Sequence, residues 1–246
     1  MIEITDKYIK NGQLDKEALA RLGADVVEIE DDKITFKGVV AFYNCNALAS
    51  LAGATFNRGV DFERCHSLTS LAGATFNGDV VFSYCESLTS LEGATFNDYV
   101  KFRDCDSLVS ADGTTFNGKV DFLRCNSLTS VSGAAFKGDV YFYECESLTS
   151  LAGATFNGGV YFSHCPSLKT VTGATFNGYV EFNWCRSLIS VSGAVFKGKV
   201  NFNGCDSLSS VNEAAFNGDV EFYKCKSLAS LDLGLFKGNV RVTNRS

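Results

Sequence analysis

The chain contains very few of the residues that most often build catalytic or metal sites. Among 246 residues there are two histidines and one tryptophan, and the histidines His66 and His164 lie far apart in the sequence. Neither a Ser-His-Asp arrangement nor a zinc site can be assembled from them, and no Cys-x-x-Cys pair is present. The glycines are isolated and do not form a phosphate-binding loop. We therefore expect no enzymatic activity, no cofactor and no metal.

Long apolar runs and blocks of like charge are also missing. No stretch approaches the eighteen or so apolar residues of a membrane span. The N-terminus, MIEITDKYIKNGQLD, lacks the basic start and apolar stretch of a secretory signal. The net charge of -6 is mild and spread along the chain, whereas a phosphate-binding surface would be basic. We expect neither a membrane span nor a nucleic-acid partner.

What the sequence does have is a strict repeat of twenty residues. One cysteine marks each period, and the surrounding frame recurs, as in SLTSLAGATFNGDVVFSYC at residues 67–85. The ten cysteines are Cys45, Cys65, Cys85, Cys105, Cys125, Cys145, Cys165, Cys185, Cys205 and Cys225. A unit this short cannot bury its own apolar side chains, so it must lie against its neighbours. The repeat predicts a solenoid.

The cysteine spacing predicts a buried column of reduced thiols. Each cysteine stands between core residues, such as Phe82 and Leu88 around Cys85. Stacked columns lie about 4.8 Å apart, but parallel Cβ vectors suit a disulfide poorly. Such a column implies a reducing compartment. This compartment is the cytoplasm, or a host cytosol into which the protein is delivered without a visible signal peptide.

The columns that stay apolar or small predict the interior of each coil. Val-x-Phe alternates with the two-residue period of a half-buried strand, and the next apolar residues follow in steps of three. One coil shows the whole set: Val60, Phe62, Cys65, Leu68, Leu71 and Phe76. Gly73 and Gly78 mark corners, and the Ala-Thr-Phe segment between them is expected to be a corner as well. The Val-x-Phe segments, from Val40 to Val240, are expected to pair in register as one long parallel sheet.

The frame Val-x-Phe-x-x-Cys-x-Ser-Leu-x-Ser-Leu resembles the leucine-rich repeat family over about residues 36–242, in its cysteine-containing and short bacterial forms. The resemblance implies a mainly β, right-handed solenoid of about ten 20-residue coils with one long parallel sheet. Two features depart from that family. The step from Phe76 to Val80 is four residues, and phenylalanine replaces leucine at the second strand position. A straighter β-solenoid is the alternative.

A weaker resemblance is to pentapeptide-repeat proteins, because twenty is four times five. Residues 69–73 and 74–78 are similar to two consecutive pentapeptides. The pattern then fails at Val81, whose column elsewhere holds Lys101, Asp121 and Glu181. A four-sided pentapeptide coil needs an apolar centre on every side, so this alternative is the less favoured one.

Residues 1–35 do not follow the repeat and predict an N-terminal cap. Residues 2–4 alternate like a short strand, Asp15 can cap a helix that runs to Leu22, and a further strand leads into the solenoid of residues 36–246. A small separate domain is the alternative. The C-terminal end of the solenoid is predicted to be uncapped. It could be shielded by a partner, self-associate, or continue in a longer protein.

The variation between copies carries the functional signal. Five columns change from coil to coil, those of Asp79, Val81, Ser83, Tyr84 and Glu86, and they surround the inward-facing strand residues. These columns hold eight of the nine tyrosines, both histidines and the tryptophan. Exposed aromatic residues anchor protein interfaces. The candidate partner-binding residues are Tyr99, Tyr141, Tyr143, Tyr161, His164, Tyr179 and Trp184.

The sequence therefore favours a non-enzymatic binding module that recognises a protein partner through this aromatic-rich strand face. A purely structural solenoid is the main alternative. The residues of a solvated face can vary without constraint, and tyrosine is a good strand former. Ice binding through the serine and threonine columns is disfavoured by Lys169 and Ile189, which interrupt the threonines. Nucleic-acid mimicry is disfavoured because the strand face mixes acidic residues with basic ones such as Lys101 and Arg103.

Overall fold

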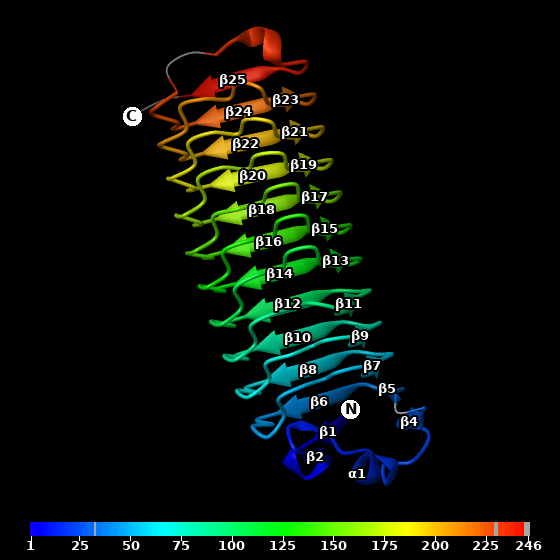
Figure 1. Ribbon diagram of the computed structural model, residues 1–246. Helices are drawn as coiled ribbons and strands as arrows, with labels where there is room; N and C mark the ends of the chain where they lie inside the picture. The colour runs from blue at the N-terminus through cyan, green and yellow to red at the C-terminus, as the bar shows by residue number, and fades with distance from the viewer. Residues whose placement is uncertain (32, 229–230, 244–246) are drawn as a thin grey trace.

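The chain folds into an elongated stack of coils. A computed structural model describes residues 1–31, 33–228 and 231–243. The N-terminal segment lies at one end of the stack and the last strand at the other (Figure 1). The stack runs as a nearly straight column and does not curve into a horseshoe (Figure 1). The predicted solenoid is confirmed, and its shape is that of the straighter alternative.

One long parallel sheet of twelve strands runs the length of the column, as the sequence predicted. Its strands are β1 (Ile2–Ile4), β6 (Val40–Tyr43), β8 (Val60–Glu63), β10 (Val80–Ser83), β12 (Val100–Arg103), β14 (Val120–Leu123), β16 (Val140–Tyr143), β18 (Val160–Ser163), β20 (Val180–Asn183), β22 (Val200–Asn203), β24 (Val220–Tyr223) and β25 (Val240–Thr243). From β6 to β25, neighbouring strands pair twenty residues apart, so that Val80 faces Val100 and Phe82 faces Phe102. Because valine and phenylalanine alternate with other residues, the buried side chains all lie on one face of the sheet.

A second parallel ladder lies where the sequence analysis expected only a corner. It is an eleven-stranded sheet in which β4 (Val27–Glu30) runs antiparallel to β5. The other strands are β5 (Lys33–Phe36), β7 (Thr55–Phe56), β9 (Thr75–Phe76), β11 (Thr95–Phe96), β13 (Thr115–Phe116), β15 (Ala135–Phe136), β17 (Thr155–Phe156), β19 (Thr175–Phe176), β21 (Val195–Phe196) and β23 (Ala215–Phe216). Isolated bridges such as Ser70 to Ser90 link a third side of the coils. The Ala-Thr-Phe corner was therefore wrong, because its last two residues form a strand.

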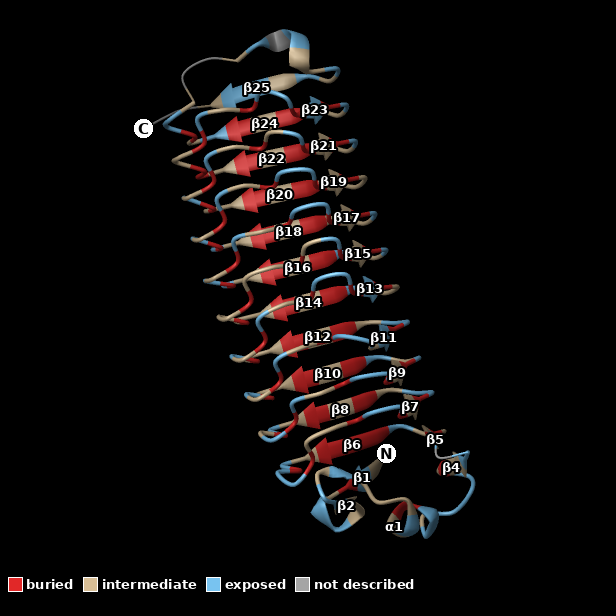
Figure 2. Cartoon of the chain, viewed as in Figure 1, coloured by how far each residue is buried: buried red, intermediate tan, exposed pale blue. Residues whose placement is uncertain are grey.

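Stacked phenylalanines fill the core between the two sheets. Phe62 and Phe82 are stacked with ring centroids 5.0 Å apart, and the same contact recurs along the column. The second column meets the first edge to face, as in Phe76 and Phe82 at 5.7 Å and 86°. Both arrangements are favourable for aromatic rings. Figure 2 shows the consequence, an uninterrupted buried stripe along the strands of the long sheet from β6 to β24.

The two repeating glycines, which were expected to mark corners, have different roles. Gly73 adopts φ of 70°, which is the left-handed region. Gly78 has no such angle, but a Cβ there would lie 2.7 Å from the carbonyl carbon of Arg58 in the preceding coil. One glycine therefore permits the turn, and the other permits the close approach of successive coils.

The cysteines form the predicted ladder of buried thiols, and none of the ten is in a disulfide. Most of these thiols also have a hydrogen-bond partner in the preceding coil. The Sγ of Cys125 donates to the carbonyl oxygen of Phe102 at 3.7 Å, and Cys65 donates to that of Phe42 at 3.3 Å. Each such thiol therefore binds the end of the strand in the preceding coil. Burial raises the pKa of Cys105 and of Cys165 to about 12.

We expect the native protein to show few reactive thiols. The thiolate is the nucleophile, and burial both suppresses its formation and blocks access to it. Titration with a chromogenic disulfide reagent at neutral pH should detect few groups in native protein and all ten in denaturant. Rapid reaction of all ten under native conditions would contradict the inward placement.

The N-terminal segment packs on the end of the column. β1 adds to the long sheet beside β6, and the short helix α1 (Lys16–Ala20) begins at Asp15, whose Oδ1 accepts hydrogen bonds from two backbone amides. Leu19 is fully buried. The helix is shorter than expected, since Leu22 follows it. The sequence analysis also missed the 3₁₀ turn η1 (Asp6–Tyr8) and the hairpin of β2 (Ile9–Lys10) and β3 (Gln13–Leu14). At the other end a second 3₁₀ turn, η2 (Leu233–Leu235), precedes β25.

Candidate binding face

Four of the predicted tyrosines gather on the outward face of the long sheet. Tyr141 and Tyr161 are paired neighbours on β16 and β18, and their rings stack with centroids 4.6 Å apart at 10°. The ring of Tyr143 lies 5.7 Å from that of Tyr141, and the ring of Tyr179 lies 5.8 Å from that of Tyr161. We call these four residues the tyrosine ridge. The ridge forms because residues twenty apart are brought into register.

Tyr99 is joined to the ridge through a lysine and not through a ring contact. The Nζ of Lys119 lies 4.3 Å from the ring centroid of Tyr141 and 5.7 Å from that of Tyr99. Both distances are in the range of a cation–π interaction. The ridge therefore ends at a cation that covers the outer face of Tyr141.

The tyrosine hydroxyls of this face remain neutral donors. Burial raises the pKa of Tyr99 to about 12, with a further contribution from Asp121 and Asp79. Burial also raises the pKa of Tyr141 and of Tyr161, and nearby carboxylates add to the effect. An uncharged phenol can both donate and accept a hydrogen bond. The face thus offers aromatic edges together with hydroxyl groups.

His164 and Trp184 lie at the turn that follows each long strand. The Nδ1 of His164 lies 3.1 Å from the Oγ of Ser163. The Trp184 ring lies against Gly204, where a Cβ would come within 2.7 Å of it, and Arg186 lies 5.4 Å from its centroid. Within the described part of the chain, neither residue has a ring contact with the tyrosine ridge. Ring contacts therefore join four of the seven predicted residues, and Tyr99 is linked to them through Lys119.

The turn that holds these two residues has an unusual backbone. Its position, which we call the corner column, lies in the left-handed region in every coil. The residues are Asn44, Arg64, Tyr84, Asp104, Arg124, Glu144, His164, Trp184, Gly204 and Lys224. Residues other than glycine pay about 1–2 kcal/mol there. The sequence analysis identified the variation of this column but not its conformation, because glycine, the usual signal, occurs only at Gly204.

Two charges of the corner column, on Asp104 and Arg124, are paired with each other. Arg124 donates from Nε and from an Nη to the carboxylate of Asp104, at 2.7 and 3.1 Å. Arg64 and Arg103 both lie over the ring of Tyr84, at 5.6 and 5.5 Å. These residues therefore form a network that includes the neighbouring Arg103, while the exposed Glu144 has no ion pair with any described residue.

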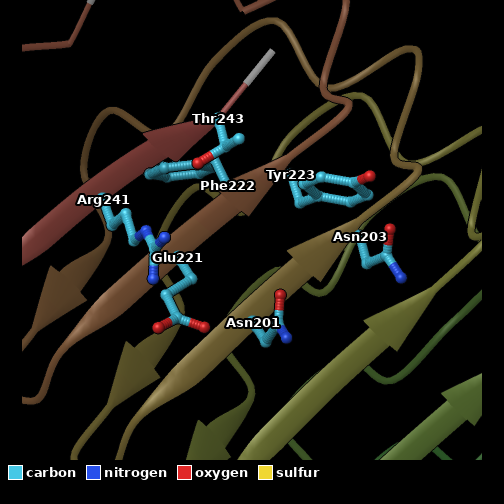
Figure 3. Close-up of a pocket in the computed structure, with 7 residues that line it drawn as sticks. All are labelled: Asn201, Asn203, Glu221, Phe222, Tyr223, Arg241 and Thr243. Carbon is cyan, nitrogen blue, oxygen red and sulfur yellow. The ribbon is translucent and has the colours of Figure 1, made fainter. Parts of the chain in front are cut away.

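A hollow of about 320 Å³ opens on the same sheet face towards its C-terminal end (Figure 3). We call it the amide hollow. It is lined by Asn201, Asn203, Glu221, Phe222, Tyr223, Arg241 and Thr243. The sequence analysis missed it, because single polar residues in variable columns look like an ordinary solvated face. Only the register of β22, β24 and β25 places them side by side.

The described residues contain no group of three or more His, Cys, Asp or Glu side chains that could hold a metal ion. In the same part of the chain, no helix is long and apolar enough to cross a membrane. Comparison of the chain with protein-family models, with curated proteins and with solved structures found no match. The functional argument therefore rests on the geometry of the chain itself.

Proposed function

We propose that this chain is a non-enzymatic binding module, a repeat protein of the bacterial, leucine-rich-repeat-like type that recognises a protein partner through its aromatic-rich strand face. The observation that carries the proposal is the tyrosine ridge. Its rings are held by mutual stacking on a continuous sheet. Side chains that are already ordered lose little conformational entropy on binding. Tyrosine also supplies a large contact area and a polar group at once.

The surroundings of the ridge favour a protein over a nucleic acid as partner. Three carboxylates lie close enough to raise the pKa of the ridge tyrosines: Asp121, Asp139 and Glu181. Their negative charge disfavours a polyanion as partner. Lys119 is the cation that covers the ridge directly. We place the module in a reducing compartment, the cytoplasm or a host cytosol, since ten free thiols would be retained there.

A structural role for the ridge is the second candidate. The facing rings of Tyr141 and Tyr161 cover each other, and Lys119 covers the outer face of Tyr141. Such cross-strand pairs stabilise a sheet by about 0.2–1 kcal/mol each without any partner. The two candidates predict different effects of a tyrosine substitution. If the ridge is an interface, the substitution weakens partner binding. If the ridge is structural, the substitution lowers stability alone.

We expect Tyr161→Ala to weaken partner binding by at least about 2 kcal/mol, the cost typical of a central aromatic anchor. The partner would first be captured with the immobilised wild-type chain and then titrated against each variant by calorimetry. Circular dichroism should show an intact fold, because the Tyr161 side chain is half-buried and not part of the core.

Two control variants make the test specific. Tyr84→Ala removes the same side chain from the corner column, away from the ridge, and Lys169→Ala removes an exposed side chain from another side of the coil. Both should bind almost as wild type. Equal losses in all three variants, or no loss in Tyr161→Ala, would refute the ridge as the interface. Titration of Trp184→Ala with the same partner tests whether the corner column contributes to binding.

A further inference from the structure

We infer that the column contains a joint between the coil of residues 89–98 and the coil of residues 109–118, at which its two halves tilt against each other. The joint lies between β11 and β13, near the middle of the column (Figure 1). Its existence does not depend on the proposed protein partner, and only its use in binding rests on that proposal.

The first sign of the joint is a missing backbone hydrogen bond in the second sheet. In every other neighbouring pair from β7 to β23, the later coil donates two bonds to the earlier one, as the amides of Thr95 and Asn97 do at 2.9 and 2.8 Å. Between β11 and β13, the amide of Asn117 keeps its bond, but the amide of Thr115 has no partner among the described residues. The two strands therefore pair at one position, that of Phe116, where other pairs have two.

The coils are also separated and tilted at this place. Ala94, whose carbonyl oxygen would accept the missing bond, is half-buried, whereas the alanines of the same column in other coils are buried. A hollow of about 380 Å³ opens there, lined by residues 91–95, 112–115 and 117. The ring planes of Phe96 and Phe116 are inclined by 17°, against 6° and 5° for the stacked pairs of this column on either side.

Two departures from the repeat within one coil explain the opening. Ala111 stands in an inward column that holds Leu91 and Val131 in the adjacent coils, so it leaves space that the larger residues fill. Thr114 stands in a column of alanines, and a larger side chain in a packed position forces its neighbours apart. Thr114 is only 8% exposed, and its hydroxyl forms no hydrogen bond with a described residue. The repeat is thus underfilled at one position and overfilled at another.

The long sheet continues across the joint and acts as the hinge. β12 and β14 pair at all four positions, and the amide of Val100 donates to the carbonyl oxygen of Lys119 at 2.9 Å. The turn at Gly93 connects the third side of the coil to the second sheet, so it lies opposite the long sheet. Further opening at this turn tilts the two halves towards the outward face of the long sheet.

Such a tilt changes the shape of the proposed binding face. The outward face of the long sheet becomes concave when the opposite side of the column opens. Tyr99 belongs to the half before the joint, whereas Lys119 and the tyrosine ridge belong to the half after it. A hinge at this place therefore lets the face adapt its curvature to a convex partner.

Amide hydrogen exchange of the full chain, measured by NMR, tests the joint. The Thr115 amide should exchange at least about tenfold faster than the amides of Thr95 and Ala135, which form the equivalent bonds. The double variant Ala111→Leu/Thr114→Ala restores the repeat and should slow the exchange of Thr115 to the rate of those two. Equal rates for the three amides in the wild type would overturn the inference, and so would a double variant that leaves Thr115 unchanged or fails to fold.

Val171→Leu is the matched control, because it enlarges a side chain of the same inward column in a coil with regular pairing. It should leave the exchange of Thr115 as in the wild type. Slowing of Thr115 by this variant as well would assign the effect to general stability and not to a local joint.

Distances between paired spin labels test whether the two halves tilt. Labels would be attached to cysteines introduced at exposed residues, since the ten native thiols are buried. The pair at Asn77 and Lys137 spans the joint, whereas the pair at Asn157 and Asn217 has the same separation in sequence within one half. The first pair should give the broader distance distribution, and Ala111→Leu/Thr114→Ala should narrow it to the width of the second. Equal widths in the wild type would refute the hinge.

Discussion

Phe162→Ala should lower the free energy of unfolding by about 3–5 kcal/mol, the usual cost of deleting a buried aromatic ring. The ring is 1% exposed and stacks between Phe142 and Phe182, with both centroid distances 5.0 Å. Its removal takes away the burial of one ring and also one contact face of each neighbour. The in-register backbone holds the two flanking rings apart, so the cavity cannot close by a small shift.

Hydrogen exchange is the measurement that matches this architecture. Coils contact only their neighbours, so the loss is expected to be largest in β16, β18 and β20 and to fade along the column. Denaturant unfolding would report the same loss as a single value only if the column unfolds cooperatively. Lys169→Ala, with its exposed side chain, should change stability by no more than about 0.5 kcal/mol. A cost below 1 kcal/mol for Phe162→Ala would contradict the stacked core.

The sequence predicted the core because each inward column keeps its residue type through the repeats. Val80, Phe82 and Cys85 could be assigned to the inside from the two-residue and three-residue steps alone. The second sheet could not be predicted in this way. Its strands are only two residues long, as in Thr75–Phe76, and so short a segment has no measurable alternation. A corner and a two-residue strand have the same pattern in the sequence.

The candidate site could be predicted only in part, for a similar reason. The strict period put Tyr141 beside Tyr161, and their rings do stack. The same period put Trp184 one coil from His164, but it gave no sign that both residues lie in a left-handed turn. The amide hollow depends on the register of three strands and on the bond that the Nδ2 of Asn203 donates to Asn183, and a sequence pattern contains no such information.

Deletion of residues 1–35 should cause aggregation and a large loss of stability. The truncation removes β1, which pairs with β6, and it exposes the edge of the long sheet at Val40 and Phe42. It also removes the carbonyl of Ile4, which accepts from the Cys45 thiol at 3.1 Å. An unpaired, apolar strand edge is a template for pairing with other chains. Size-exclusion chromatography and light scattering should therefore show oligomers where the full chain gives a single species.

Deletion of residues 121–140 is the control for shortening as such. It removes one full period from the middle of the column, so Val120 is followed by Tyr141 and every column keeps its residue type. Because each coil presents the same inward residues, the new neighbours can stack in the same register, and we expect a folded, non-aggregating chain. If the chain without residues 1–35 remained monomeric and as stable as the full chain, the segment would be a separate domain and not a cap. Aggregation of the truncated chain alone would assign the effect to the exposed end, where Phe42 loses its paired neighbour Ile4.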